Sequence, residues 1–139
     1  MRHEAIATLS GRRVVLMDSI STVGPADAGC IIVSGSHGGR ISGAFACKHP
    51  PALVAFNDAG GGKNGAGVAA LSLLEDAGIP ALAVSHSSAR IGDAGDTWSH
   101  GRVSALNASA TAAGLRAGMS VAEACTRFSA LAGKEARRA

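Results

Sequence analysis

Short apolar runs alternate along the chain with longer stretches in which apolar residues recur at helical spacing. A short, continuously apolar run is typical of a strand buried on both faces of a sheet. Such runs, each ending in or followed by polar residues, predict strands at 12–19, 30–34, 52–56 and 79–84. Before the first of them, Ser10-Gly11 separates two apolar runs and favours a hairpin turn.

Helical spacing predicts two helices in the first half of the chain. The first has Ile41, Ala44 and Phe45 on one side. It must end before Pro50, because proline disfavours helix in the residue that precedes it. The second helix follows a loop at 57–65, and Gly78 and Pro80 end it in the usual order. Its apolar face consists of Val68, Leu71, Leu74 and Ala77.

The second half begins with a predicted loop at 85–101. A helix is then predicted over 102–113, with a short strand near Val103 as the alternative. Ser120 and Glu123 fit a capping box, which starts a last helix. The inner face of that helix is formed by Val121, Cys125, Phe128 and Leu131.

Strands that alternate with helices predict a three-layer α/β fold, in which a mainly parallel sheet carries helices on both faces. We expect one domain over 1–133 and a basic tail over 134–139. The glycine-rich strand ends resemble those of Rossmann-like and flavodoxin-like domains, and this resemblance implies an architecture without implying a chemistry.

Composition supports a globular chain. Hydrophobic residues make up 47% of the sequence and charged residues 17%, which argues against disorder. Aromatic residues make up only 3%, so the core must be built from Val, Ile, Leu and Ala. Cys30, Cys47 and Cys125 are far apart and lack zinc spacing, so we expect reduced, packed thiols.

The distribution of charge and the N-terminal sequence bear on whether the protein binds nucleic acid or a membrane. The formal net charge of +3 comes largely from the two ends of the chain, and no basic stripe interleaved with aromatic residues is present. Nucleic-acid binding therefore has little support. The first residues lack the apolar core of a signal peptide, and no apolar run approaches membrane length. We expect a cytoplasmic protein without a membrane partner.

The glycine-rich loop that follows the strand at 52–56 is suited to a small anion. Glycine amides without side chains and a following helix start would attract negative charge, Lys63 would add a cation, and Asn64 would cap the helix. The alternative is that the glycines only make a tight turn. The spacing of Gly60, Gly62 and Gly65 matches a dinucleotide fingerprint, but the next strand ends in Ser85-His86, where an acidic residue would hold the ribose.

Lys63 is followed by asparagine, and the upstream glycine spacing differs from that of a Walker loop. NAD and ATP are therefore weakly supported, and the cofactor stays open. The loop by itself has the features needed to bind a smaller anion, such as a phosphate or carboxylate group on a metabolite. No two candidate metal ligands lie at a helical metal spacing, so no metal site is assigned.

Polar residues stand at the carboxyl ends of all the predicted parallel strands, where α/β sheets bind ligands. We expect them to share one pocket. The candidate catalytic residues are Ser36, His37, Asp58, His86 and Asp18. The candidate residues for binding the anion or the substrate are Gly35, Gly38, Gly39, Asn57, Gly60, Gly61, Gly62, Lys63, Asn64, Ser85, Ser87 and Arg90.

The roles within this set differ. Ser36 partly matches a nucleophile elbow, but a hydroxyl that binds a ligand or caps a helix fits its sequence better. His37 and His86 would move protons, with Asp18 or Asp58 orienting one of them; the alternative is that each is a surface histidine. Arg90 either clamps a substrate carboxylate or forms an ion-pair network with neighbouring aspartates.

Together these patterns predict an enzyme that acts on a small anionic metabolite by acid–base chemistry, as a hydrolase, lyase or isomerase. The alternative is a nucleotide- or flavin-binding module, or a subunit of a larger enzyme, without chemistry of its own. Small residues over 105–118 would let two helices pack closely, so we expect a homo-oligomer.

Overall fold

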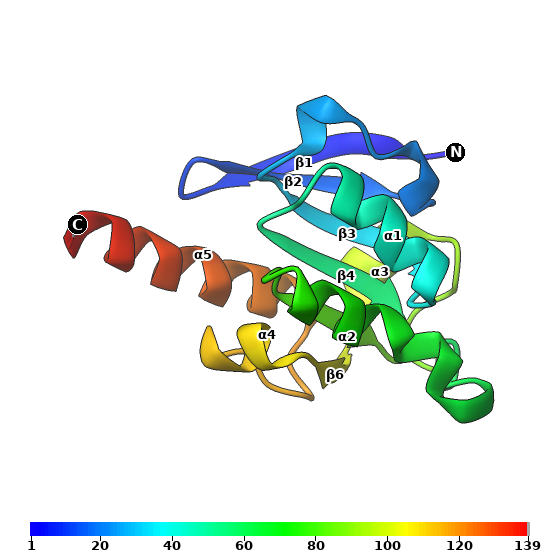
Figure 1. The fold of residues 1–139 in the computed structure, drawn as a ribbon. Helices are drawn as coiled ribbons and strands as arrows, with labels where there is room; N and C mark the ends of the chain where they lie inside the picture. The colour runs from blue at the N-terminus through cyan, green and yellow to red at the C-terminus, as the bar shows by residue number, and fades with distance from the viewer. Residues whose placement is uncertain (139) are drawn as a thin grey trace.

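A six-stranded sheet forms the centre of the computed structural model, which describes residues 1–138 apart from the side chains of 63, 64 and 132–138. The order of the strands across the sheet is their order along the chain (Figure 1). The strands are β1 (His3–Leu9), β2 (Arg12–Met17), β3 (Ile31–His37), β4 (Leu53–Asn57), β5 (Ala81–Val84) and β6 (Val103–Leu106).

Strands β2 to β5 are parallel, whereas β1 and β6 run antiparallel to their neighbours. The structure is therefore a mixed α/β fold with a mostly parallel sheet. The four strands predicted from apolar runs are present, and the turn at Ser10-Gly11 joins β1 and β2 as an antiparallel hairpin.

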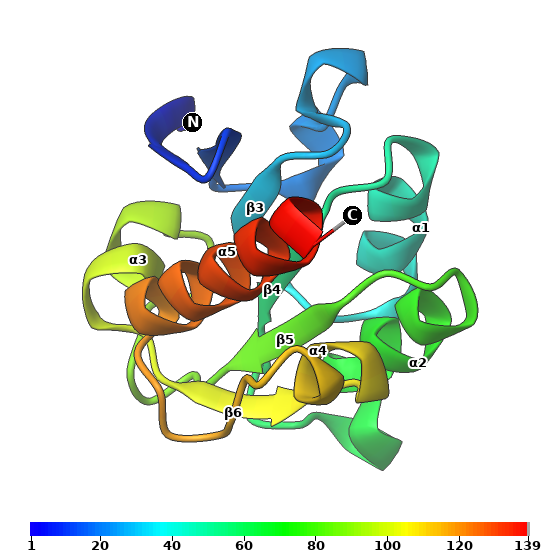
Figure 2. The ribbon, with the colours of Figure 1, turned by 90° about the vertical axis from the view of Figure 1, so that its left-hand side faces the viewer.

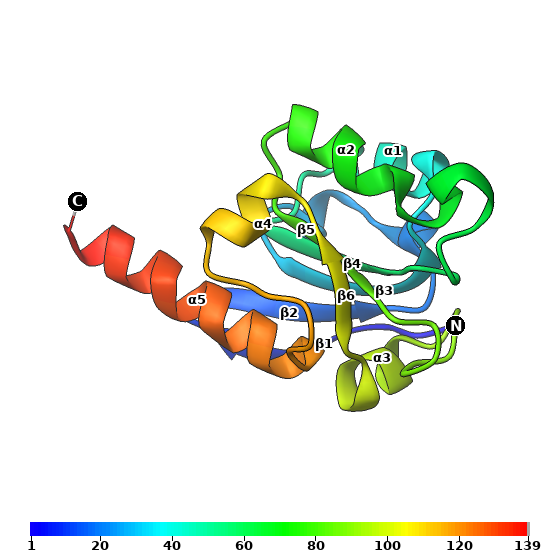
Figure 3. The ribbon, with the colours of Figure 1, turned by 90° about the horizontal axis from the view of Figure 1, so that it is seen from below.

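Helices lie on both faces of the sheet (Figures 2 and 3). Helices α1 (Arg40–Lys48) and α2 (Ala69–Asp76) are on one face, and α3 (Ala94–His100) and α5 (Val121–Arg138) are on the other. The short helix α4 (Ala108–Ala112) follows β6. Three 3-10 turns complete the elements, namely η1 (Ile20–Thr22), η2 (Pro25–Asp27) and η3 (Lys63–Val68).

The strands contribute side chains to two hydrophobic clusters. Val14 and Leu16 of β2 belong to the cluster under α3 and α5, and Val15 and Met17 belong to the cluster under α1 and α2. Because successive side chains of a strand point to opposite faces, a strand covered on both sides must be apolar throughout. This explains the continuous apolar runs of the sequence.

Helix α1 corrects one prediction. Ile41 is 73% exposed, and the buried positions are Ser42, Gly43 and Ala46. The reason is the close approach of α2, since a Cβ added at Gly43 would lie 3.1 Å from the Cβ of Ala70. Only small residues of α1 fit against α2, so the isoleucine lies on the outer side.

The predicted helix over 102–113 is wrong in its first half, and the alternative strand near Val103 is confirmed as β6. Asn107 separates strand from helix, because its Oδ1 accepts a hydrogen bond from Ala110 N at 3.0 Å and caps α4. The predicted loop at 85–101 contains a further helix, α3, whose N-cap is Asp93.

The capping box of the last helix is confirmed on its serine side, where Glu123 N donates to Ser120 Oγ at 3.1 Å. Helix α5 continues through Arg138 and so includes most of the segment predicted as a tail.

The three cysteines are free thiols, and burial raises the pKa of the Cys125 thiol to about 12. Within residues 1–138, we find no helix that combines the length and apolarity needed to cross a bilayer.

Candidate functional site

The carboxyl ends of β2 to β5 lie along one edge of the sheet, because these strands are parallel. The polar residues that follow them therefore form a row in chain order. The row runs from Asp18 through Ser36-His37 and Asn57-Asp58 to Ser85-His86.

The chain itself crosses this edge. After β5, residues 85–94 run back over the ends of β4, β3 and β2, and a residue at each of these strand ends forms a hydrogen bond with them. The bonds are Asn57 Nδ2 to Ala89 O (3.1 Å), Gly92 N to Gly35 O (2.7 Å) and Ala94 N to Asp18 Oδ1 (2.9 Å). Several polar strand ends thus bind the protein's own backbone.

Asp18 shows this structural role most clearly. Besides Ala94 N, its carboxylate accepts Arg2 N at 2.7 Å. The backbone hydrogen bond from Arg2 is the main reason why the pKa of Asp18 lies below its usual value. Asp18 anchors the N-terminal segment and the start of α3, and no described contact joins it to either His37 or His86.

Ser36 lies inside β3 and not on a strand-to-helix turn. Its Oγ accepts Ile20 N at 3.0 Å, and its own N–H donates to Ser34 Oγ at 2.9 Å. The position differs from that of a nucleophile elbow, which requires a sharp turn after the strand. The hydroxyl instead holds the start of η1 against β3.

Gly35 and Gly38 permit close approaches of the backbone. A Cβ at Gly35 would lie 2.6 Å from Asp93 N, so this glycine leaves room for the crossing segment. Gly38 N donates to Asn57 O at 2.9 Å, and Gly38 O accepts Ala70 N at 2.8 Å. Gly38 therefore connects the end of β4 to the start of α2.

The glycine-rich loop turns its first amides inward. Residues 59–62 all have positive φ. The N–H groups of Ala59, Gly60 and Gly61 donate to Asn57 Oδ1 (2.8 Å), Asp58 Oδ1 (2.8 Å) and Asp58 O (2.7 Å). The amides of Gly60 and Gly61, predicted to hold an anion, are thus bound to Asp58.

The helix start also differs from the prediction. The 3-10 turn η3 separates the glycines from α2, which begins at Ala69 with Val68 as its N-cap. Asn64 therefore does not occupy the N-cap of α2, because the chain needs an additional turn before it enters the helix. The side chains of Lys63 and Asn64 lie outside the described residues, so the role of Lys63 in anion binding stays a prediction.

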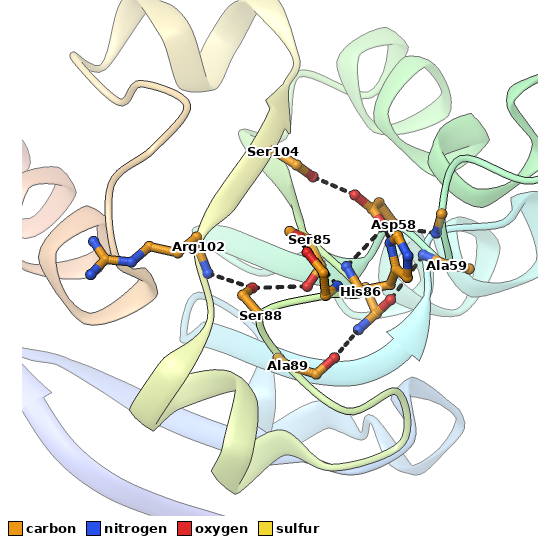
Figure 4. Close-up of polar contacts among 11 residues, drawn as sticks. Asp58, Ala59, Ser85, His86, Ser88, Ala89, Arg102 and Ser104 are labelled. Atoms are coloured by element: carbon orange, nitrogen blue, oxygen red, sulfur yellow. Dashed lines mark hydrogen bonds and ion pairs between the residues drawn. The ribbon is translucent and has the colours of Figure 1, made fainter.

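Asp58 gathers polar groups from two other segments of the chain (Figure 4). Its Oδ1 accepts His86 N at 3.1 Å and lies 3.3 Å from His86 Nδ1. Its Oδ2 accepts Ser104 Oγ at 2.7 Å. The Asp58 side chain is only 14% exposed, whereas that of His86 is 60% exposed.

These contacts determine the protonation state of Asp58. Burial by itself raises the pKa of the carboxyl, but hydrogen bonds from Ser104, Gly60 and His86 outweigh it, and the pKa lies below its usual value of 3.8. Asp58 is therefore ionised near neutral pH. A carboxylate next to Nδ1 keeps the proton of a neutral His86 on that nitrogen, which leaves Nε2 as the basic atom.

His37 has the opposite arrangement. Its Nδ1 accepts a hydrogen bond from Gly39 N at 3.3 Å, so a neutral His37 carries its proton on Nε2. The residue is exposed and pairs in the sheet with Asn57. In their neutral forms, the Nε2 atom of His86 is therefore an acceptor, whereas that of His37 is a donor.

Ser104 is the contact that sequence reasoning missed. It belongs to β6, which was predicted as part of a helix, and the pairing of Val103 with Val84 brings it to Asp58. A second serine, Ser88, stabilises the same junction, because its Oγ accepts Arg102 N at 2.9 Å (Figure 4).

The remaining predicted binding residues make local contacts. Ser85 Oγ lies 2.7 Å from Ser87 Oγ. Arg90 N donates to Asp96 Oδ2 at 2.7 Å, and Asp96 Oδ1 lies 2.9 Å from His100 Nδ1. The contact between Arg90 and Asp96 comes from the main chain, and it fixes the loop before α3.

Two hollows flank His37. The larger, of about 800 Å³, lies between the start of α1 and the glycine-rich loop and includes Gly39, Ile41 and Gly62 in its lining. The smaller, of about 500 Å³, lies beside Asp18 and Ser36. Over the part of the chain with described side chains, no three His, Cys, Asp or Glu residues are grouped so that they could hold a metal ion.

We expect Asp58 to contribute to stability only above acidic pH. A carboxyl whose pKa is lower in the folded chain than in the unfolded chain stabilises the fold above the unfolded value, here 3.8, and loses this contribution as the pH falls through the folded value. In Asp58→Asn, the free energy of unfolding in urea should therefore fall less between about pH 7 and about pH 3 than in the wild type.

The matched control is Asp76→Asn, at an exposed position of α2. This variant should follow the pH dependence of the wild type. An equal acid-induced loss of stability in Asp58→Asn and the wild type would contradict the ionised, hydrogen-bonded Asp58.

Comparison with known proteins adds no relative, since no protein-family model, curated protein or solved structure matches the chain.

Proposed function

We propose that the chain is an enzyme that performs acid–base chemistry on a small metabolite carrying a phosphate or carboxylate group, as a hydrolase, lyase or isomerase. The observation that carries this proposal is the pair of His86 and Asp58 at the carboxyl edge of the sheet. A partly buried carboxylate that orients a largely exposed imidazole is the arrangement that a general base needs.

His37 complements this base. Because Gly39 N donates to its Nδ1, the neutral ring offers a proton on Nε2. Two imidazoles in opposite tautomers at one sheet edge can divide the tasks of base and proton donor between them. Ser104 acts as a positioning residue in this proposal, since it holds the Asp58 oxygen that does not face His86.

The proposal also treats the chain as one Rossmann-like or flavodoxin-like domain of three layers over residues 1–133, in a cytoplasmic homo-oligomer. The packing of α1 and α2 against one face and of α3 and α5 against the other supports the layers. The assembly part of the proposal depends on the small residues over 105–118, because residues 118 and 119 already bond the outer backbone groups of Val103 in the edge strand β6, at 2.8 Å each.

One experiment tests the activity for all three reaction types. The protein is incubated in D₂O with a panel of small phosphate esters, carboxylate esters and hydroxy acids, and proton NMR follows hydrolysis, elimination and deuterium incorporation. We expect at least one compound to change faster than in a sample of the double variant His37→Gln/His86→Gln. Binding without any change would favour a binding module, and equal rates in both samples would contradict the proposed enzyme.

A further inference from the structure

We propose that the larger hollow binds the apolar part of the substrate, so that the substrate is an anion attached to a hydrocarbon chain or ring. This inference rests on the proposed function, because it places the metabolite at the same edge of the sheet. It goes further in assigning a chemical class to the part of the ligand that does not react.

The residues that line this hollow favour an apolar ligand group. Its volume of about 800 Å³ lies within the range of small-molecule pockets. Ile41 on its rim is 73% exposed, and Ala59, Ala66 and Ala69 also line the hollow. A ligand that covered these carbons would remove apolar surface from water, which favours binding.

The charged side chains on the lining of this hollow also favour an anionic ligand. Among the residues whose side chains the structure describes, the charged or titratable ones on the lining are Arg40 and His37, and none of them is a carboxylate. Arg40 is also the first residue of α1, whose N-cap Gly39 has no side chain to occupy the free amides. The smaller hollow, in contrast, is lined by Asp18, whose carboxylate already accepts hydrogen bonds from Arg2 N and Ala94 N. The larger hollow therefore fits an anionic group next to an apolar body.

The third argument connects this hollow to the proposed base. Ala59 and Gly62 on its lining belong to the glycine-rich loop. A Cβ added at Gly60 in the same loop would lie 3.6 Å from the His86 ring. His37 lines the hollow itself, so a ligand bound there contacts one proposed proton-transferring group, and the loop that lines the hollow also approaches the other.

A series of straight-chain carboxylates tests the inference, with acetate, butyrate, hexanoate and octanoate as probes. Dissociation constants come from amide shifts in NMR titrations of the full chain. We expect affinity to rise about two- to fourfold for each added methylene until the hollow is filled. The uncharged 1-hexanol should bind more weakly than hexanoate.

Two exposed isoleucines supply matched variants. Ile41→Asp should weaken hexanoate binding about tenfold or more, through lost apolar contact and charge repulsion. Ile91, 50% exposed and beside the smaller hollow, is the control, and Ile91→Asp should leave the affinity unchanged. Arg40→Gln should weaken hexanoate binding and leave 1-hexanol binding unaltered.

An affinity that does not change with chain length, or equal losses in Ile41→Asp and Ile91→Asp, would overturn the inference. His86→Gln separates it from the proposed function, because this variant should bind the series normally. If affinity does not change with chain length and His86→Gln loses turnover, only the apolar site is refuted. If affinity rises with chain length and His86→Gln keeps normal turnover, the apolar site is supported and the proposed chemistry is refuted.

Discussion

Replacing His86 with glutamine is expected to lower kcat by about a hundredfold to ten-thousandfold, the usual contribution of a general base. Glutamine keeps a polar side chain that can still donate to Asp58, but it cannot accept a proton from substrate. Binding contacts should remain, so KM should change much less than kcat. The measurement is steady-state kinetics on whichever compound of the D₂O panel reacts fastest.

His100→Gln is the matched control for this variant. His100 also lies beside an aspartate, Asp96, but on α3 and away from the glycine-rich loop. It should retain wild-type kcat, and both variants should retain the wild-type urea midpoint because both rings are largely exposed. Normal turnover in His86→Gln would remove the base from the mechanism, and equal losses in the two variants would show that the effect is not specific to the site.

Gly67→Ala is expected to destabilise the fold by roughly 3 kcal/mol, at the upper end of the cost of overpacking. A Cβ at Gly67 would overlap the carbonyl oxygen of Asp58 and lie 3.2 Å from the backbone of Gly61. Both neighbours are main-chain atoms of the glycine-rich loop, so neither can rotate away. The displaced loop would also move the Asp58 carboxylate relative to His86. Urea unfolding measures the loss of stability.

Gly24→Ala supplies the comparison. Gly24 has an extended backbone with φ −138°, and the nearest atom to an added Cβ is a carboxylate oxygen of Asp27 at 3.9 Å. This variant should unfold at nearly the wild-type urea concentration. A loss of stability in Gly67→Ala that is no larger than in Gly24→Ala would contradict the close packing of Gly67 on Asp58.

The sequence predicted which strand ends carry the candidate residues, but not the hydrogen-bond partners of those residues. The sequence placed His86 and Asp58 at neighbouring strand ends, which parallel strands bring to one edge. It could not show that Asp18 and Asn57 hold the segment 85–94, because their partners lie far away in the chain. Nor could it identify Ser104, whose helical-looking segment becomes a strand only by pairing with β5.

What the sequence alone determined is the set of buried strands and the edge of the sheet at which polar groups gather. These follow from local facts, since a short, continuously apolar run is typical of a strand covered on both faces and polar residues mark its end. Tertiary structure alone decided which of these polar groups remain available for a ligand. The reason is that hydrogen-bond donors and acceptors such as Asp18, Ser36 and the loop amides are equally able to bind substrate or backbone, and only the folded chain brings the competing backbone groups within reach.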